Sequence, residues 1–236
     1  MNFLSRITAA AIMGLAGAVA FAQAPAASAD EGLVPVKSRN LDKVWLLPGA
    51  DFRPYRKVLL AKAEVAFQQR WLRDMNSDRL GLTTRVTEAD ALKIVEAARA
   101  GFDQVWAEAF KSAGFEVVSA AGEGVLQVTP SVVNLYVNAP AAASVATHTF
   151  TVEAGEATLK VDFRDSRIGT LLGRVADRRE TMRSGRAQMT SAVTNRTEFG
   201  HLFANWATIA AKGLKELQAK SPVPEAPKPG QKPAPR

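Results

Sequence analysis

The chain has 236 residues, a formal net charge of +7, no cysteine and two histidines, His148 and His201. The lack of cysteine excludes a disulfide framework, thiol chemistry and an acylated cysteine anchor. Two histidines exclude a histidine-rich zinc site, although carboxylates could still bind a hard cation.

Residues 1–29 have the pattern of an export signal. Arg6 supplies the positive charge, residues 7–22 form an apolar run that is short for a membrane span, and small residues suited to cleavage follow. We predict cleavage after Ala22 or after Ala29, with an uncleaved anchor as the alternative. The mature protein is then periplasmic or secreted, with no transmembrane segment after signal removal.

Two further segments are predicted to lie outside the fold. Residues 30–40 are polar and lack periodicity, so we expect a flexible leader. Residues 221–236 are rich in proline, so we expect an extended, disordered tail. The remaining residues, 41–220, are enough for a single domain with a substantial core.

The first half of this domain is predicted to contain two strands and a long helix. Short apolar runs favour strands over residues 43–47 and 57–63. Thr87 and Asp90 have the spacing of a capping box, and an apolar face at helical spacing continues to about residue 113. Gly114 fits the position just past the helix.

The second half is predicted to be rich in strands and to end in a helix. A break is expected near Pro130, because proline cannot donate a hydrogen bond to a neighbouring strand. Residues 181–196 have no sustained period and are expected to form a loop. The expected elements are strands over residues 115–120, 125–138 and 147–153, and a helix from Thr197 to about Leu217.

The clearest local signal is a β-hairpin over residues 157–180. Apolar and polar residues alternate from Ala157 to Phe163, as in a strand with one buried face. Asp165, Ser166 and Gly169 then supply turn chemistry, since Asp and Ser side chains bond nearby backbone and Gly accepts a positive φ. The chain can return as the paired strand.

Together these elements predict an α+β fold. Sequential strands with short turns pair antiparallel, whereas a strand-helix-strand unit over residues 57–120 can make two strands parallel. Two amphipathic helices each need a sheet to cover. We expect a two-layer sandwich, with a mixed, mostly antiparallel sheet and both long helices on one face.

Positive charge is concentrated around the hairpin. Eight arginines and three acidic residues between Arg164 and Arg196 give a local net charge of +5. For an exported protein this favours an envelope protein or an anionic envelope polymer as partner, rather than nucleic acid. A solvated strand face with scattered charge is the alternative. The candidate binding residues are Arg164, Arg167, Arg174, Arg178 and Arg179.

No catalytic signature is found. A Gly-x-Ser-x-Gly elbow and a glycine-rich phosphate loop are both missing, and each histidine is interpreted as structural or as a surface residue. The hairpin carboxylates could converge, but their arginine neighbours should lower their pKa values, which disfavours an acid catalyst. Salt-bridged surface positions are the preferred interpretation of these residues: Asp162, Asp165, Asp177 and Glu180. No cofactor and no metal are predicted.

Several stretches resemble a family of bacterial envelope proteins, the domain of unknown function 3313 (DUF3313). They are DFRPYRKVLL, EGVLQVTPSVVNL, KVDFRDSRIGTLLGRVADRRE and the final WATIAAKGLKEL, and the likeness covers residues 41–218. The family's acidic-Asp-Ser-x-x-Gly turn and Asp-Arg-Arg correspond to Asp165, Ser166, Gly169, Asp177, Arg178 and Arg179. The resemblance implies an exported protein of unassigned activity, often a lipoprotein, but no cysteine follows this signal.

The leading functional hypothesis is therefore a non-enzymatic periplasmic domain that recruits or regulates an envelope partner, with the hairpin arginines as its contact surface. Two alternatives stay open. One is a hydrolase that acts on cell-wall material through the hairpin carboxylates. The other is a small-ligand binder that uses the crevice between sheet and helix.

Overall fold

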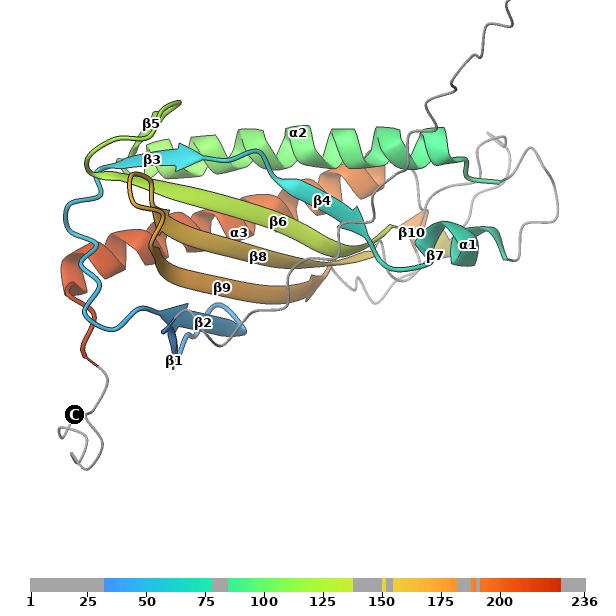
Figure 1. Cartoon of the computed structure of the whole chain (residues 1–236). Coiled ribbons are helices and arrows are strands. Elements are labelled where there is room, and N and C mark those ends of the chain that lie inside the picture. The colour runs from blue at the N-terminus through green and yellow to red at the C-terminus, as the bar shows by residue number, and fades with distance from the viewer. Residues whose placement is uncertain are drawn as a thin grey trace, which may run out of the picture.

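A mixed sheet of eight strands forms the centre of the fold (Figure 1). The computed structural model describes residues 32–77, 85–137, 150–151, 155–181, 188–189 and 192–225. The strands of the sheet are β1 (Val34–Val36), β2 (Lys43–Leu46), β3 (Lys57–Leu60), β4 (Glu64–Phe67), β5 (Glu116–Val118), β6 (Val125–Val137), β8 (Gly155–Asp165) and β9 (Leu171–Glu180).

The sheet order is β1-β2-β9-β8-β6-β3-β5, and β4 also pairs with β6. Pairing is antiparallel from β1 through β6 and parallel where β3, β4 and β5 join. A separate two-stranded sheet pairs β7 (Phe150–Thr151) with β10 (Gln188–Met189). The helices are α1 (Trp71–Asn76), α2 (Glu88–Ser112) and α3 (Ala192–Lys220).

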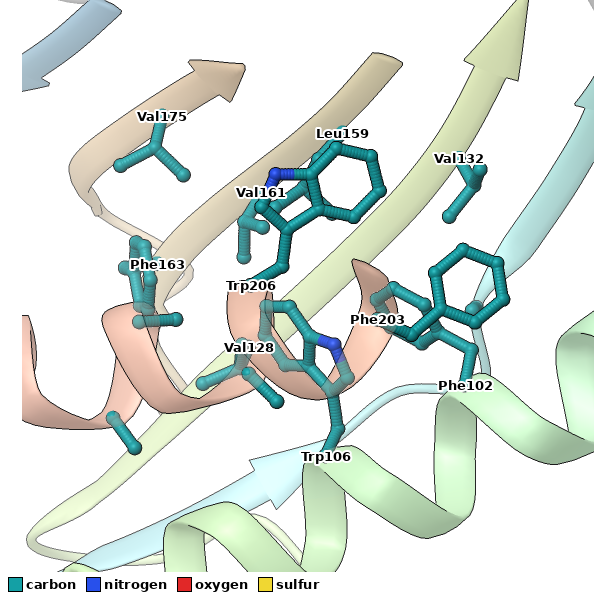
Figure 2. Close-up of a cluster of buried hydrophobic side chains, with 14 of the residues drawn as sticks. Phe102, Trp106, Val128, Val132, Leu159, Val161, Phe163, Val175, Phe203 and Trp206 are labelled. Atoms are coloured by element: carbon teal, nitrogen blue, oxygen red, sulfur yellow. The ribbon is translucent and has the colours of Figure 1, made fainter. Parts of the chain in front are cut away.

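The two long helices cover one face of the large sheet. Phe102 and Trp106 of α2 and Phe203 and Trp206 of α3 lie between the helices and the inward-facing residues of the strands (Figure 2). Phe102 and Phe203 meet edge to face, with ring centroids 5.2 Å apart, which joins the two helices. The predicted α+β sandwich with both helices on one face is confirmed.

The start and the end of α2 agree with the sequence. The Thr87 hydroxyl accepts from the Asp90 N–H at 3.2 Å, and the Asp90 carboxylate accepts from the Thr87 N–H at 3.1 Å, which completes the capping box. Gly114 has φ of +86° just past the helix. Leu92 has the spacing of the predicted apolar face, but it is 55% exposed, so the buried face of α2 is narrower than the predicted one.

The predicted break at Pro130 is wrong, since β6 runs through it without interruption. The Val128 carbonyl accepts from the Ala61 N–H, so the backbone polar groups of residues 128 and 130 face the β3 and β4 side. On that side β3 pairs with β6 up to Val128, and β4 begins at Ser131. The missing N–H therefore falls in the gap between two strands, where no hydrogen bond is lost.

The predicted ends of the domain need correction. The leader over 30–40 contains β1, which pairs with β2. The tail begins later than residue 221, because Val223 is buried and exchanges hydrogen bonds with the backbone of Gly49 and Ala50. Helix α3 starts at Ala192, within the predicted loop. Residues 1–31 and 226–236 lie outside the described residues, as does His148.

Candidate binding groove

The sheet is wider than the two helices that cover it. Seven strands side by side at about 4.8 Å span about 29 Å, whereas two packed helices cover about 20 Å. Helix α2 contacts β4 and β5, which places it over one side of the sheet. Helix α3 packs beside α2, and β1 and β2 form the edge of the sheet on the side away from β5 (Figure 1).

A groove of about 1130 Å³ lies between this edge and α3. One wall is formed by β1, β2 and the segment between them, and the other by the flank of α3 from Asn205 to Lys220. Buried residues of the sheet and of α3, including Leu46, Val175 and Trp206, form its base. The partly exposed apolar residues along its walls are Val36, Leu41, Val44, Ile209 and Leu217.

The wall between β1 and β2 is held by specific hydrogen bonds. The Ser38 hydroxyl accepts from the N–H groups of Asn40 and Leu41 at 3.2 and 3.1 Å. The Asn40 carbonyl accepts from Arg179 Nη2 at 2.7 Å, and Asp42 accepts from the Arg178 N–H at 2.9 Å. These contacts tie the segment to β9, so this side of the groove has a defined shape.

Asp177 is a buried carboxylate beside the groove that joins β9 to α3 and to the residue before β2. Its side chain is 3% exposed and accepts from the Asp42 N–H at 2.9 Å, from Arg179 Nε at 2.6 Å and from Trp206 Nε1 at 2.7 Å. The surface position predicted for Asp177 is therefore wrong. Residues alternate along β9, and Asp177 falls on the face beneath α3.

The rim of the groove is basic. Lys37 and Arg39 lie on the strand side, and Lys212 lies on α3. None of these three side chains has an ion-pair partner among the described residues. The acidic residue at the rim, Glu216, already pairs with Lys220 at 3.6 Å. The electrostatic potential at the rim therefore favours an anion.

The five predicted binding arginines do not gather in one patch. Strand alternation places Arg164, Arg174 and Arg178 on the face of the sheet away from the helices and Arg179 on the helix side. Arg179 lines the groove, and so does part of Arg174, whose guanidinium pairs with Asp162. Arg167 is exposed at the tip of the hairpin. The charge that is clustered in the sequence is thus distributed over three parts of the surface.

Most of these arginines pair with acidic neighbours. Arg174 forms a bidentate pair with Asp162, with Nε–Oδ1 and Nη2–Oδ2 distances of 2.6 and 2.7 Å. Arg164 also contacts Asp162, at 3.3 Å. Arg178 pairs with Glu156. Their role in binding a partner stays a prediction.

The turn of the hairpin is ordered by the motif residues. Asp165 accepts from the N–H groups of Arg167 and Ile168 at 2.8 and 3.0 Å, and from the Tyr55 hydroxyl at 2.7 Å. The Ser166 hydroxyl donates to the Gly122 carbonyl and accepts from its N–H, both at 3.1 Å. Gly169 has the positive φ, +74°, that the turn requires.

These contacts shift two pKa values in opposite directions. Partial burial opposes ionisation of Asp165, but hydrogen bonds from the Ile168 N–H, the Tyr55 hydroxyl and the Arg167 N–H together hold its pKa below the usual value. Burial, and next the hydrogen bond to Asp165, raise the pKa of Tyr55. Asp165 is thus held as a carboxylate, which is a poor state for a general acid.

The hairpin carboxylates face different directions. Asp162 and Glu180 lie on the outer face of the sheet, Asp177 lies beneath α3, and Asp165 lies in the turn. A paired-carboxylate site needs two such groups at one substrate position. Across the described ranges, no three His, Asp or Glu side chains are placed to hold a metal ion.

The sequence suggested a crevice between sheet and helix as one alternative ligand site, but neither its position nor its lining residues were predicted. Lys37 and Arg39 fall in the segment expected to be flexible, and three residues offer no period from which to recognise β1. Ile209 and Leu217 belong to the apolar residues that recur at helical spacing over residues 199–217. This apolar stripe was the sequence signal for the groove. It is wider than the surface that α3 needs to pack against the sheet, and its outer residues line the groove.

Comparison with models of protein families finds no match, and comparison with curated proteins finds none either. Among solved structures, the chain is similar to the PelC dodecamer from Paraburkholderia phytofirmans, at 8% identity over 71% of this chain and 96% of that one, with a TM-score of 0.36. A DUF330 protein from Xanthomonas campestris gives 11% identity, 74% and 91% coverage and a TM-score of 0.40. A neuraminyllactose-binding hemagglutinin homologue from Helicobacter pylori is 10% identical over 79% of this chain and 92% of that one, with a TM-score of 0.35. At these TM-scores the likenesses establish neither the fold nor a function.

Within the described parts of the chain, no helix is both long enough and apolar enough to cross a membrane.

Proposed function

We propose that this protein is an exported, non-enzymatic binding domain of the bacterial cell envelope that holds its ligand or partner in the groove beside α3. The groove carries the proposal, because it combines uncovered apolar walls with a basic rim on an ordered frame. Apolar pockets with a few well-placed polar groups are the usual form of ligand sites. The signal-like N-terminus supports export.

Membership in the DUF3313 family is part of this proposal. The motif residues on which the resemblance rests form structural contacts in this fold. Asp165, Ser166 and Gly169 order the hairpin turn, and Asp177 and Arg179 join β9 to the groove wall. These contacts give a physical reason for the motif that does not require catalysis.

Site-specific crosslinking in the native envelope tests the proposed site. Thr208 lies exposed on α3 at the groove, and Leu92 is exposed on α2 away from it. A photoreactive phenylalanine analogue at Thr208 is expected to give defined adducts by mass spectrometry, whereas the same group at Leu92 is not. Equal adducts at both positions would contradict a groove site.

A variant that fills the groove completes this test. Gly213 lies on α3 at the groove, and a Cβ built there meets no atom within 4 Å, so Gly213→Trp should fold and occupy the space. Gly101→Trp is the matched control, since Gly101 is an exposed helical glycine of α2 with equally open surroundings. The Thr208 adducts should disappear with Gly213→Trp and persist with Gly101→Trp.

Export is tested separately. The N-terminal sequence of the protein recovered from a periplasmic fraction should begin at Gln23 or Asp30, after one of the two predicted cleavage sites. An intact Met1 on a protein confined to the cytoplasm would overturn the envelope part of the proposal. The binding groove would then still be tested by the crosslinking experiment.

A further inference from the structure

The groove presents apolar surface along both walls. Val36 is 40% exposed, and Leu41 and Val44 continue the apolar strip from β1 to β2. Ile209 and Leu217 face them from α3. Covering such a strip with a hydrocarbon chain is favourable because it removes apolar surface of both groups from water.

The same groove has three cations at its rim with no acidic partner among the described residues. Lys37 and Arg39 come from the strand wall and Lys212 from the helix wall, so an anion at the rim would be approached from both sides. Arg179 is excluded from this set, because it is engaged by Asp177 and by the Asn40 carbonyl. The cations are therefore available to a ligand without breaking the fold.

From this juxtaposition we infer that the groove binds a single anionic phospholipid, with an acyl chain along the apolar strip and the phosphate head group between Lys37, Arg39 and Lys212. The inference rests on the proposed binding function of the groove and names its ligand. Free phosphate would leave the apolar strip uncovered, and a neutral hydrocarbon would leave the cations unused.

The size of the groove favours a lipid over a protein segment. Its volume of about 1130 Å³ lies slightly above the range of about 300–1,000 Å³ that is typical of small-molecule pockets. A single lipid is somewhat larger than a drug-sized ligand and suits such a space.

Binding can be measured with three soluble probes below their micelle concentrations. They are lysophosphatidylglycerol, lysophosphatidylcholine with the same acyl chain, and glycerol phosphate. Calorimetry should show binding of the first, about ten-fold weaker binding of the second, and none of the third. Both lysolipids carry the phosphate, but the choline cation of the second cancels its net charge and is repelled by the basic rim, so its binding is weaker. The preference should shrink at high salt.

Two variants separate the head group from the chain. Lys37→Glu, Arg39→Glu and Lys212→Glu together should remove the preference for lysophosphatidylglycerol while leaving lysophosphatidylcholine binding unchanged. Gly213→Trp should abolish both, and Gly101→Trp neither. Trp206 provides a second readout, because bromine on the acyl chain should quench its fluorescence if the chain reaches the base of the groove.

The outcomes distinguish this inference from the proposed function. Equal binding of the two lysolipids would overturn head-group recognition and retain an acyl-binding groove. No lysolipid binding, combined with a defined protein adduct at Thr208, would overturn the lipid and retain the groove as a protein site. No lysolipid binding and no groove-specific adduct would overturn both.

Discussion

At the scale of single residues, Asp177 connects the candidate site to the core. A buried carboxylate with three donors is stable because each donor compensates part of the lost hydration. Its three donors come from Asp42 just before β2, from Arg179 in β9 and from Trp206 in α3. One side chain therefore fixes the positions of both groove walls relative to the base.

We predict that Asp177→Asn lowers the free energy of unfolding by about 2–4 kcal/mol, because it removes the charge paired with Arg179 and places an amide donor among donors. Urea unfolding at pH 7 measures the change. Asp51→Asn is the control, since Asp51 pairs with Arg53 at the exposed surface and its loss should change stability little. Equal effects of the two substitutions would contradict the role assigned to Asp177.

At the scale of elements, the hairpin turn is fastened to the segment before β3. The Tyr55 hydroxyl donates to Asp165, and the Gln218 amide of α3 contacts the Tyr55 carbonyl. The Ser166 N–H also donates to the Val125 carbonyl at the start of β6. The turn is thus held by neighbours on both sides, and its geometry does not depend on its own residues alone.

We predict that Tyr55→Phe destabilises the protein by about 1–2 kcal/mol at pH 7 and that the difference shrinks on acidification. Asp165 has a lowered pKa in the folded state, so its contribution is present above the ordinary value of 3.8 and is lost as pH falls through the folded value. Unfolding curves between pH 7 and pH 3 test this. Tyr136→Phe is the control, because the Tyr136 hydroxyl bonds to no described residue.

Whether an element could be predicted from the sequence depends on whether its contacts are local or come from distant parts of the chain. The hairpin and the capping box at Thr87 could be predicted from local sequence patterns, because the residues that define each of them are close together in the chain. Pro130, β1 and Val223 could not be placed, since their surroundings come from distant segments: the gap between β3 and β4, the edge of β2, and the backbone at Gly49. The groove depends on such long-range placement throughout.

At the scale of the whole molecule, the groove exists because the sheet is wider than the layer of two helices that packs on it. The sheet gains two strands, β1 and β2, on the side away from β5. The segment after α3 then crosses back to the start of the fold. Ser221 Oγ accepts from the Phe52 N–H at 2.9 Å, and Val223 pairs with Gly49 and Ala50 at 3.0 and 2.8 Å.

We predict that the chain truncated after Glu225 is as stable as the full chain, whereas truncation after Lys220 lowers the free energy of unfolding by about 2–4 kcal/mol. The second truncation removes buried Val223 and three hydrogen bonds that hold the end of α3 against residues 49–52. Hydrogen exchange should show loss of protection at the Gly49 and Phe52 amides. Because Leu217 and Lys220 line the groove, truncation after Lys220 should also weaken lysolipid binding. Equal stability of the two truncated chains would contradict the role of residues 221–225 in holding the end of α3.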